Sequence, residues 1–187
     1  MKHVSRARNT RLTVILFAIA LITLGGNAAV AMTLNSAAFQ QNGHIPTKYT
    51  CEAEDVSPPL AWEGVPEDAK SLVLIIDDPD APDPKAPKMV WVHWVVYNIP
   101  PDTKGLPENA RGARLPQGTL LGVNDFKKTG YGGPCPPIGR HRYFHKLYAL
   151  DITLELTGAT KSQIERAMQG HVLATAELIG TYQKGDR

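Results

Sequence analysis

The chain has 187 residues, of which 43% are hydrophobic and 20% are charged. This composition supports one domain with a buried core and excludes a disordered chain or a coiled coil. The formal net charge of +2 arises in the first 31 residues, which hold four basic and no acidic side chains. Without them the formal charge is −2, so overall charge gives no support to nucleic-acid binding.

Residues 1–31 have the order of a secretory signal peptide. A basic start precedes the apolar run Leu12–Leu24, and Ala29-Val30-Ala31 matches a small-x-small cleavage site. As a helix this run would be about 20 Å long, less than the ~30 Å hydrocarbon core, which favours a cleaved leader over a retained anchor. We therefore predict a signal peptide over residues 1–31, a single domain over residues 32–187 and a periplasmic or secreted location.

The first half of the domain contains three predicted strands. Thr33–Phe39 could form the first, before a turn at residues 41–43. Ser71–Asp77 and Val90–Ile99 are continuous apolar runs, which are typical of strands buried on both faces. Residues 78–88 between them contain four prolines, and they predict a stiff connecting loop because proline has no N–H to donate.

The second half begins with an irregular segment over residues 100–140, rich in glycine and proline. Arg142–Leu150 is predicted as a strand, and Thr160 as the cap of a helix that runs to about Gln169. The β-branched residues of Val172–Tyr182 favour a final strand over a continued helix. These elements predict a mainly β domain, an antiparallel β-sandwich with one or two peripheral helices.

The domain contains two cysteines, Cys51 and Cys135. They could form one disulfide that closes a long loop, or they could be two small thiols that are buried separately. Both alternatives stand, because a disulfide depends on the distance between the two backbones.

Two aspartates follow the first apolar run. Asp78 ends the run, so we expect it to be partly buried and to need a hydrogen-bonding partner. His93 is a suitable partner because it lies among apolar residues, and strict alternation places Trp91, His93, Val95 and Tyr97 on one face of their strand. The alternative for both aspartates is a local Asx turn in the proline-rich loop, and this is what we predict for Asp80.

His141 and Tyr143 lie where residues 132–140, rich in glycine and proline, enter a strand. Glycine lets a ligand approach the backbone closely, so this loop could offer N–H groups to an anion. Imidazole N–H groups and a tyrosine hydroxyl are further donors, and a carboxylate behind a histidine favours the charged ring. The alternatives are histidines that only fill the core and a loop that only connects two elements.

Enzymatic alternatives have weaker support. The aspartates and histidines have no compact metal-binding spacing, so we expect no metal and no other cofactor. Ser57 and Cys135 are available as nucleophiles, but neither lies in a sequence context that marks a hydrolase. We therefore expect a protein that is not an enzyme.

Several motifs together resemble the phosphatidylethanolamine-binding protein family, which is also known through the Raf kinase inhibitor protein. They are Tyr49–Cys51, Ser57–Trp62, Asp78–Pro82, Trp91–Trp94, Gly133–Pro137 and Gly139–Tyr143. The likeness extends over residues 32–183 and is greatest to a bacterial branch that includes periplasmic members. It implies a β-sandwich with a small anion pocket, and a binding protein rather than an enzyme.

The resemblance also implies which residues form the pocket. The positions that would line it are Asp78, His93, Gly133, His141 and Tyr143, with Asp80, Trp91 and Pro134 close by. The implied ligand is phosphate or a phosphoethanolamine-like head group, as a small molecule or on a lipid. A role as an inhibitor that binds a protease or kinase is the alternative, and a homodimer is a further possibility.

His145 departs from the family pattern, which usually has an apolar residue there. By alternation it shares a face with His141. It could be a third pocket histidine, but we expect a buried or rim histidine without a role in binding.

Overall fold

The computed structural model describes residues 31–185 and contains two sheets. The strands among these residues are β1 (Thr33–Asn35), β2 (Gly43–His44), β3 (Leu60–Glu63), β4 (Ser71–Asp78), β5 (Trp91–Ile99), β6 (Gly105–Leu106), β7 (Leu120–Leu121), β8 (His141–Leu150) and β9 (Val172–Tyr182). The helices are the 3₁₀ turns η1 (Thr47–Tyr49) and η2 (Gly112–Arg114) and the α-helix α1 (Lys161–Ala167). No helix of residues 31–185 is long and apolar enough to cross a membrane.

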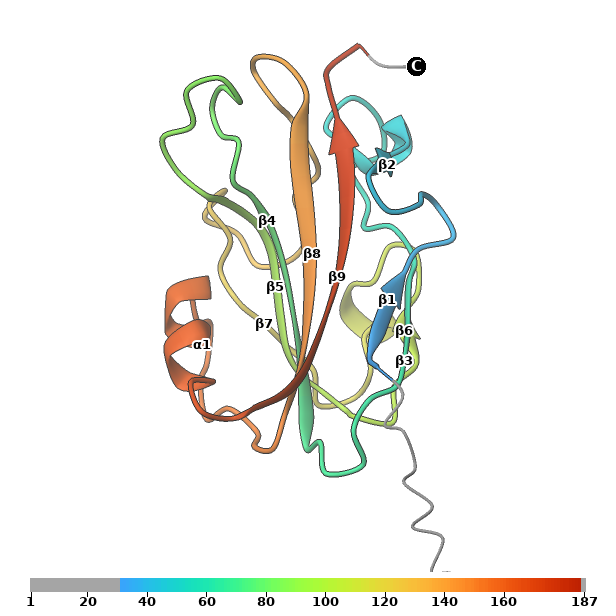
Figure 1. Ribbon diagram of the computed structural model, residues 1–187, viewed down its shortest axis with the longest axis vertical. Coiled ribbons are helices and arrows are strands. Elements are labelled where there is room, and N and C mark those ends of the chain that lie inside the picture. Colours follow the sequence, from blue (N-terminus) through green and yellow to red (C-terminus); the bar gives the residue numbers. More distant parts are fainter. Residues whose placement is uncertain (1–30, 186–187) are drawn as a thin grey trace, which may run out of the picture.

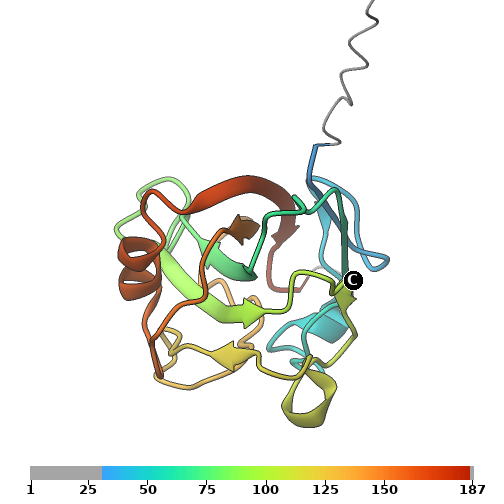
Figure 2. The ribbon, with the colours of Figure 1, turned by 90° about the horizontal axis from the view of Figure 1, so that it is seen from below.

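The large sheet has the strand order β2-β9-β8-β4-β5-β7, and the small sheet has the order β1-β3-β6. All strand pairs are antiparallel except the short pair β2–β9. The small sheet lies against one face of the large sheet, and α1 lies against the other (Figures 1 and 2). The predicted mainly β sandwich is therefore confirmed.

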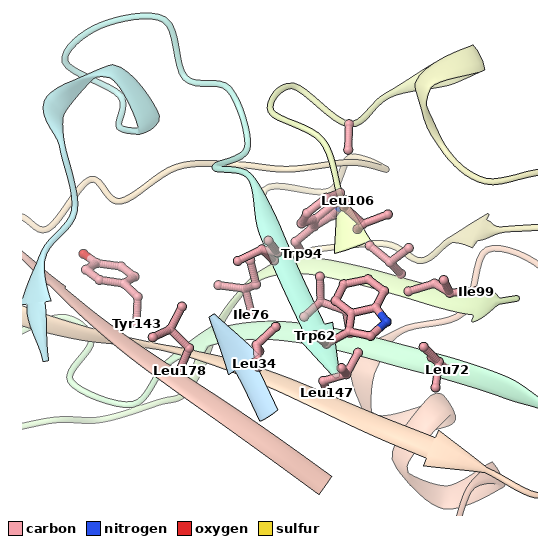
Figure 3. Packing of buried hydrophobic residues seen from close by; sticks show 14 of the residues in the cluster. Leu34, Trp62, Leu72, Ile76, Trp94, Ile99, Leu106, Tyr143, Leu147 and Leu178 are labelled. Atoms are coloured by element: carbon pink, nitrogen blue, oxygen red, sulfur yellow. The ribbon is translucent and has the colours of Figure 1, made fainter. Parts of the chain in front are cut away.

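The core between the two sheets contains the largest apolar side chains. Trp62 from β3 and Leu106 from β6 pack there against Leu74 from β4 and Trp94 from β5 (Figure 3). A second cluster joins the other face of the large sheet to α1 and includes Ile164. Burying both faces explains why β4 is a continuous apolar run rather than an alternating one.

The long predicted elements are present with small shifts in their ends. β5 and β8 each begin within one residue of the predicted start, β9 forms as a strand, and Thr160 caps α1 through a capping box. The first strand is shorter than predicted because Ser36 turns the chain: its hydroxyl accepts from the Ala38 N–H and donates to the Pro59 carbonyl. The two-residue strands β2, β6 and β7 had no pattern from which to predict them.

Candidate anion-binding site

A pocket of about 350 Å³ lies at one end of the large sheet, where β4 ends and β5 and β8 begin. The β4–β5 register pairs Asp78 with Trp91, which brings the loops that follow and precede these strands together. The lining residues are Asp78, Ala81, Pro82, Met89, Trp91, His93, Phe126, Cys135, Pro136, Pro137, His141 and Tyr143. Four of them are polar and group around the strand ends, and the others form largely apolar walls.

A β-bulge in β5 turns His93 toward the pocket. Ile76 of β4 pairs with Trp94, but the next residue, Asp77, pairs with Val92, so His93 is the extra residue. Its backbone carbonyl instead accepts from the Gly132 N–H. The prediction that His93 shares a face with Val95 and Tyr97 is wrong for this reason: those two side chains pack toward α1.

Asp78 and His141 form the buried polar centre of the pocket. Nδ1 of His141 donates to Oδ2 of Asp78 at 2.7 Å, and both side chains are at most 5% exposed. The Nε2 of the same ring lies 3.0 Å from the Ile138 carbonyl oxygen. Both ring nitrogens of His141 are therefore occupied by acceptors of the protein, which fixes the orientation of the ring. The expected partner of Asp78 was His93, and the structure gives that place to His141.

His93 is held by the backbone instead. Its Nδ1 donates to the Gly132 carbonyl at 2.6 Å, and Nε2 has no hydrogen-bond partner among the described residues. Burial lowers the pKa of His93, although the bond to Gly132 opposes this effect. The ring is therefore neutral near pH 7 and lines the pocket with one nitrogen that can accept a proton.

Tyr143 lies between the two histidines. Its ring centroid is 5.2 Å from that of His93 and 6.5 Å from that of His141. The residue is 1% exposed, and its hydroxyl has no hydrogen-bond partner among the described residues. Burial raises the pKa of this hydroxyl, so it remains protonated and can donate to a ligand. Buried hydroxyls usually have a hydrogen-bond partner, so the unpaired Tyr143 hydroxyl indicates a place where a ligand could bind.

Asp80 lies outside the lining and has a different role from the predicted turn. Both of its carboxylate oxygens accept from the Arg142 guanidinium, at 2.7 and 2.9 Å, and one also accepts from the Arg142 N–H. The hydrogen bond from Arg142 lowers the pKa of Asp80. The local turn is made by Asp78, whose Oδ1 accepts from the Asp80 N–H at 2.8 Å.

Gly133 and Pro134 also lie outside the lining. The Gly133 N–H donates to Oδ1 of Asp55 at 2.6 Å, so the expectation that it faces an anion is wrong. A side chain at Gly133 would collide with this carboxylate and with the Tyr49 carbonyl, which explains the glycine. The Pro134 carbonyl accepts from the Cys51 N–H at 3.1 Å.

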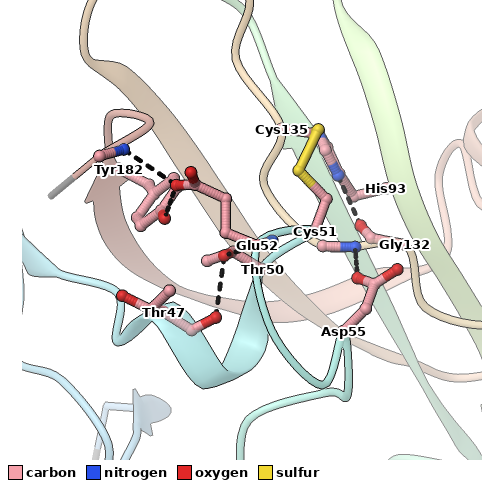
Figure 4. The surroundings of a disulfide bond; sticks show 11 residues. Thr47, Thr50, Cys51, Glu52, Asp55, His93, Gly132, Cys135 and Tyr182 are labelled. Atoms are coloured by element: carbon pink, nitrogen blue, oxygen red, sulfur yellow. Dashed lines mark hydrogen bonds between the residues drawn. A yellow bond between two sulfur atoms is a disulfide. The ribbon is translucent and has the colours of Figure 1, made fainter. Parts of the chain in front are cut away.

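Cys51 and Cys135 are joined by a disulfide with a Cα–Cα distance of 5.5 Å. The bond connects the segment that carries Glu52 and Asp55 to the chain that continues from Gly132 (Figure 4). Cys135 lines the pocket together with Pro136 and Pro137. The resemblance assigned the pocket wall to Gly133 and Pro134. The wall is formed by the residues that follow them, beginning with the disulfide-bonded Cys135.

His145 points to the same side of β8 as His141 but does not line the pocket. It is 1% exposed, its Nδ1 lies 3.2 Å from the Tyr143 carbonyl, and its ring contacts Phe39. Burial lowers the pKa of His145 to about 4. It is a neutral histidine of the core at neutral pH.

Sequence reasoning did not identify the apolar part of the pocket. Phe126 lies against both Trp91 and His93, with ring centroids 5.4 and 5.5 Å apart. Four of the seven large apolar side chains that are exposed in the described chain lie on the surrounding loops: Met89, Val90, Phe126 and Ile138. A phenylalanine followed by Lys127 and Lys128 in a loop was the available signal, since such loops usually avoid apolar side chains.

Residues 31–185 contain no group of three or more His, Cys, Asp and Glu side chains placed to hold a metal ion. The donor set described above consists of a carboxylate already bonded to one histidine and of two further groups that are free to bind. Of these two groups, the Tyr143 hydroxyl can donate to an anion oxygen, and Nε2 of neutral His93 can accept from a protonated one.

Comparison with known proteins gives close relatives. A UPF0098 protein of Methanothermobacter thermautotrophicus is 56% identical over 156 residues, which cover 82% of this chain and all of the relative. Among solved structures, a phosphatidylethanolamine-binding protein homologue of Chlamydia trachomatis has a TM-score of 0.75 and 46% identity, covering 82% of this chain and 98% of its own. Escherichia coli YbcL, described as a new member of the mammalian family, has a TM-score of 0.74 and 32% identity, covering 82% and 99%.

The relatives contradict the predicted periplasmic or secreted location. The M. thermautotrophicus protein and further relatives are archaeal UPF0098 proteins, which in general lack signal peptides. The predicted leader over residues 1–31 lies, apart from its last residue, outside the described residues. The basic-apolar-small pattern at the start of the chain was therefore insufficient to assign a location.

The model of the family described as phosphatidylethanolamine-binding protein matches residues 35–183, which is most of the chain. The fold agrees, since the two solved structures above have the same mainly β architecture. Membership supports a general role as a binding protein. On this match and these identities, the chain belongs to the phosphatidylethanolamine-binding protein family.

Proposed function

We propose that this protein binds small phosphate-bearing molecules, including lipid head groups, in the pocket around His93, His141 and Tyr143, and that it is not an enzyme. The observation that carries the proposal is the Tyr143 hydroxyl, which is buried at the pocket without a partner. A phosphate oxygen would give it one. Leaving such a group unpaired in a folded protein costs about 1–3 kcal/mol, which ligand binding would recover.

The polar groups of the pocket suit a phosphate group that can carry a proton. His141 lines the pocket in an orientation that Asp78 holds in place. Nε2 of neutral His93 accepts a hydrogen bond from a protonated phosphate oxygen, or takes up a proton and donates to an unprotonated one. Tyr143 and His93 would thus contact different oxygens of the same group.

The surroundings favour a ligand with an apolar part next to the phosphate. Inorganic phosphate has five heavy atoms and fills only a fraction of a 350 Å³ pocket. The remaining walls are largely apolar, and the same loops carry exposed basic residues: Lys85, Lys88, Lys127, Lys128 and Arg140. An apolar rim surrounded by basic side chains fits an amphiphilic phosphate ester or an anionic lipid surface.

The two candidate nucleophiles are unsuited to a hydrolase in this pocket. Cys135 has no free thiol because it is bonded to Cys51. Ser57 is 2% exposed, does not line the pocket, and its hydroxyl accepts from the Ala110 N–H at 2.9 Å. A nucleophile needs an adjacent base and access to substrate, so these contacts support binding rather than catalysis.

The proposal is tested by calorimetric titration with inorganic phosphate and with phosphoethanolamine. Tyr143→Phe removes the hydroxyl alone and should weaken binding about tenfold, because one hydrogen bond to a charged group is lost. The matched control is Tyr148→Phe, in the same strand on the face toward α1, which should leave the affinity unchanged. Equal affinities of the wild type and Tyr143→Phe would contradict the proposed site.

Two further experiments distinguish a lipid head group from a free phosphate ester as the ligand, and binding from catalysis. Vesicles of anionic phospholipid should bind the wild type more tightly than neutral vesicles, and a charge reversal at Lys127 and Lys128 should reduce this difference. Turnover of a phosphoester or carboxyl ester by the wild type, lost in His141→Ala, would instead indicate a hydrolase.

A further inference from the structure

The pocket wall formed by Cys135, Pro136 and Pro137 has few attachments to the rest of the protein. Neither proline has an N–H, and none of the three residues makes a backbone hydrogen bond with another part of the described chain. The nearest backbone contacts lie on either side of the wall: the Pro134 carbonyl accepts from Cys51, and the Ile138 carbonyl lies against His141. Between these two backbone contacts, the disulfide is the covalent link from the wall to another part of the chain.

The other end of the disulfide lies in a well-anchored segment. The Thr50 hydroxyl donates to the Thr47 carbonyl at 2.8 Å, and the Tyr49 carbonyl accepts from the Tyr131 hydroxyl at 2.8 Å. Asp55 binds the Gly133 N–H, two residues before Cys135. The wall is therefore connected to this support by the disulfide and, just before Cys135, by the hydrogen bonds of Gly133 to Asp55 and of Cys51 to the Pro134 carbonyl.

We propose that the Cys51–Cys135 disulfide positions this wall for ligand binding, and that its reduction by a dithiol weakens binding of the phosphate group. The inference rests on the proposed function, and it adds a redox dependence to the same pocket. The disulfide acts through position: Cys135 and the two prolines line the same pocket as Tyr143, and in that place they would limit how far the ligand can move.

The two sulfurs differ in access, which gives the reduction a direction. Cys51 is exposed, whereas Cys135 is half-buried against the pocket. A thiolate of the dithiol attacks Sγ of Cys51, the S–S bond breaks, and Cys135 leaves as a thiolate that takes up a proton. The second thiol of the reductant then displaces Cys51, so two electrons and two protons pass to the protein and the reductant becomes a cyclic disulfide.

The test compares the affinity of the oxidised and reduced protein for inorganic phosphate. Dithiothreitol suits this purpose because it is uncharged and does not compete for an anion site, and a thiol assay confirms reduction. We expect the dissociation constant to rise about tenfold on reduction, as for other contacts that hold a binding group in place. The double variant Cys51→Ser/Cys135→Ser should bind as weakly as the reduced protein and should not respond to dithiothreitol.

Weaker phosphate binding after reduction could arise from a less stable protein instead of a displaced pocket wall, and two variants distinguish these causes. Ile164→Val lowers stability in the cluster at α1, on the far side of the large sheet, and should leave phosphate affinity unchanged. Asp55→Ala removes one of the hydrogen bonds that attach the wall. It should weaken binding more in the reduced protein than in the oxidised protein, because the disulfide and this hydrogen bond partly substitute for each other.

Hydrogen exchange at Cys51 and Gly133, whose amides donate to the Pro134 carbonyl and to Asp55, gives a readout that does not depend on a ligand. Faster exchange at these amides after reduction, with unchanged exchange in β4, supports the positioning role. Equal phosphate affinity and equal exchange in both redox states would overturn it. If the oxidised protein binds no phosphate, the proposed function fails, and the exchange at these two amides still decides whether the disulfide positions the wall.

Discussion

The Asp78 carboxylate accepts a hydrogen bond from Nδ1 of His141 at 2.7 Å, and the two side chains are 5% and 1% exposed. This pair joins the last residue of β4 to the first residue of β8, strands separated by more than 60 positions in the chain. It fixes the orientation of the histidine ring. The position of His141 in the pocket therefore depends on Asp78, although a ligand need not contact the carboxylate itself.

Asp78→Asn should reduce both stability and binding. The amide cannot replace the buried carboxylate to which His141 donates, so we expect the free energy of unfolding to fall by about 3 kcal/mol and phosphate affinity to fall at least tenfold. Urea denaturation and calorimetric titration measure the two effects. Asp80→Asn is the control: its partner Arg142 has a side chain that is 55% exposed, so the loss should be about 1 kcal/mol or less.

Asp77→Asn should reduce stability without changing the pocket. Asp77 is fully buried on the opposite face of the sheet, where it accepts from Lys146 at 2.9 Å and from Lys161 at 2.5 Å. Burial disfavours the charge of Lys161, but the hydrogen bonds and the attraction of Asp77 and Glu165 together outweigh it and raise the pKa of the lysine. Removing the shared carboxylate should cost about 2 kcal/mol in urea denaturation. A change in phosphate affinity would show that the two faces are coupled.

Anion binding should strengthen as pH falls, because the pKa of free His93 is lowered by burial and a bound anion would raise it. Sulfate is the suitable probe, since its own charge is constant between pH 5 and pH 8. Titrations over this range should show proton uptake on binding and a tighter complex at the acid end. His93→Gln should bind sulfate with little dependence on pH. A pH-independent affinity of the wild type would contradict the assignment of a neutral His93.

His145→Leu should make the protein less sensitive to acid. The pKa of His145 is about 4 in the folded protein and about 6.5 in the unfolded chain. The unfolded state therefore binds more protons between these values, and stability falls as pH decreases from about 6.5 to about 4. The difference between the two pKa values corresponds to a loss of about 3 kcal/mol. Urea denaturation at pH 7.5 and at pH 4.5 should show a smaller difference for the leucine variant.

The sequence was sufficient to predict the long elements of the fold. β4 and β5 are visible as apolar runs because both faces of the large sheet are covered there, and Thr160 indicates the start of α1. The short strands carry no such information, since two residues show no period. Their positions follow from contacts between segments distant in the chain, such as β2 beside β9.

Five of the predicted residues, Asp78, Trp91, His93, His141 and Tyr143, line the pocket, but the contacts among them were not predicted. Alternation assigns His93 to a face, and a single bulge reverses that assignment. Which histidine meets Asp78 depends on the register of three strands, which composition does not determine. The direction of the Gly133 N–H likewise depends on Asp55, 78 positions earlier in the chain.

Strand β4 has a further property that bears on how the chain selects its native pairing. Leu72, Leu74 and Ile76 face one side and Val73 and Ile75 the other, and the strand ends in a carboxylate for each side. Sliding it by one residue would exchange two apolar faces and two aspartates, so hydropathy hardly distinguishes the two alignments. Side-chain shape must make the distinction: the slipped strand would present β-branched groups where the sandwich core accommodates leucines. Substitutions here that conserve hydropathy but change branching are therefore a route to misregistered, aggregation-prone chains.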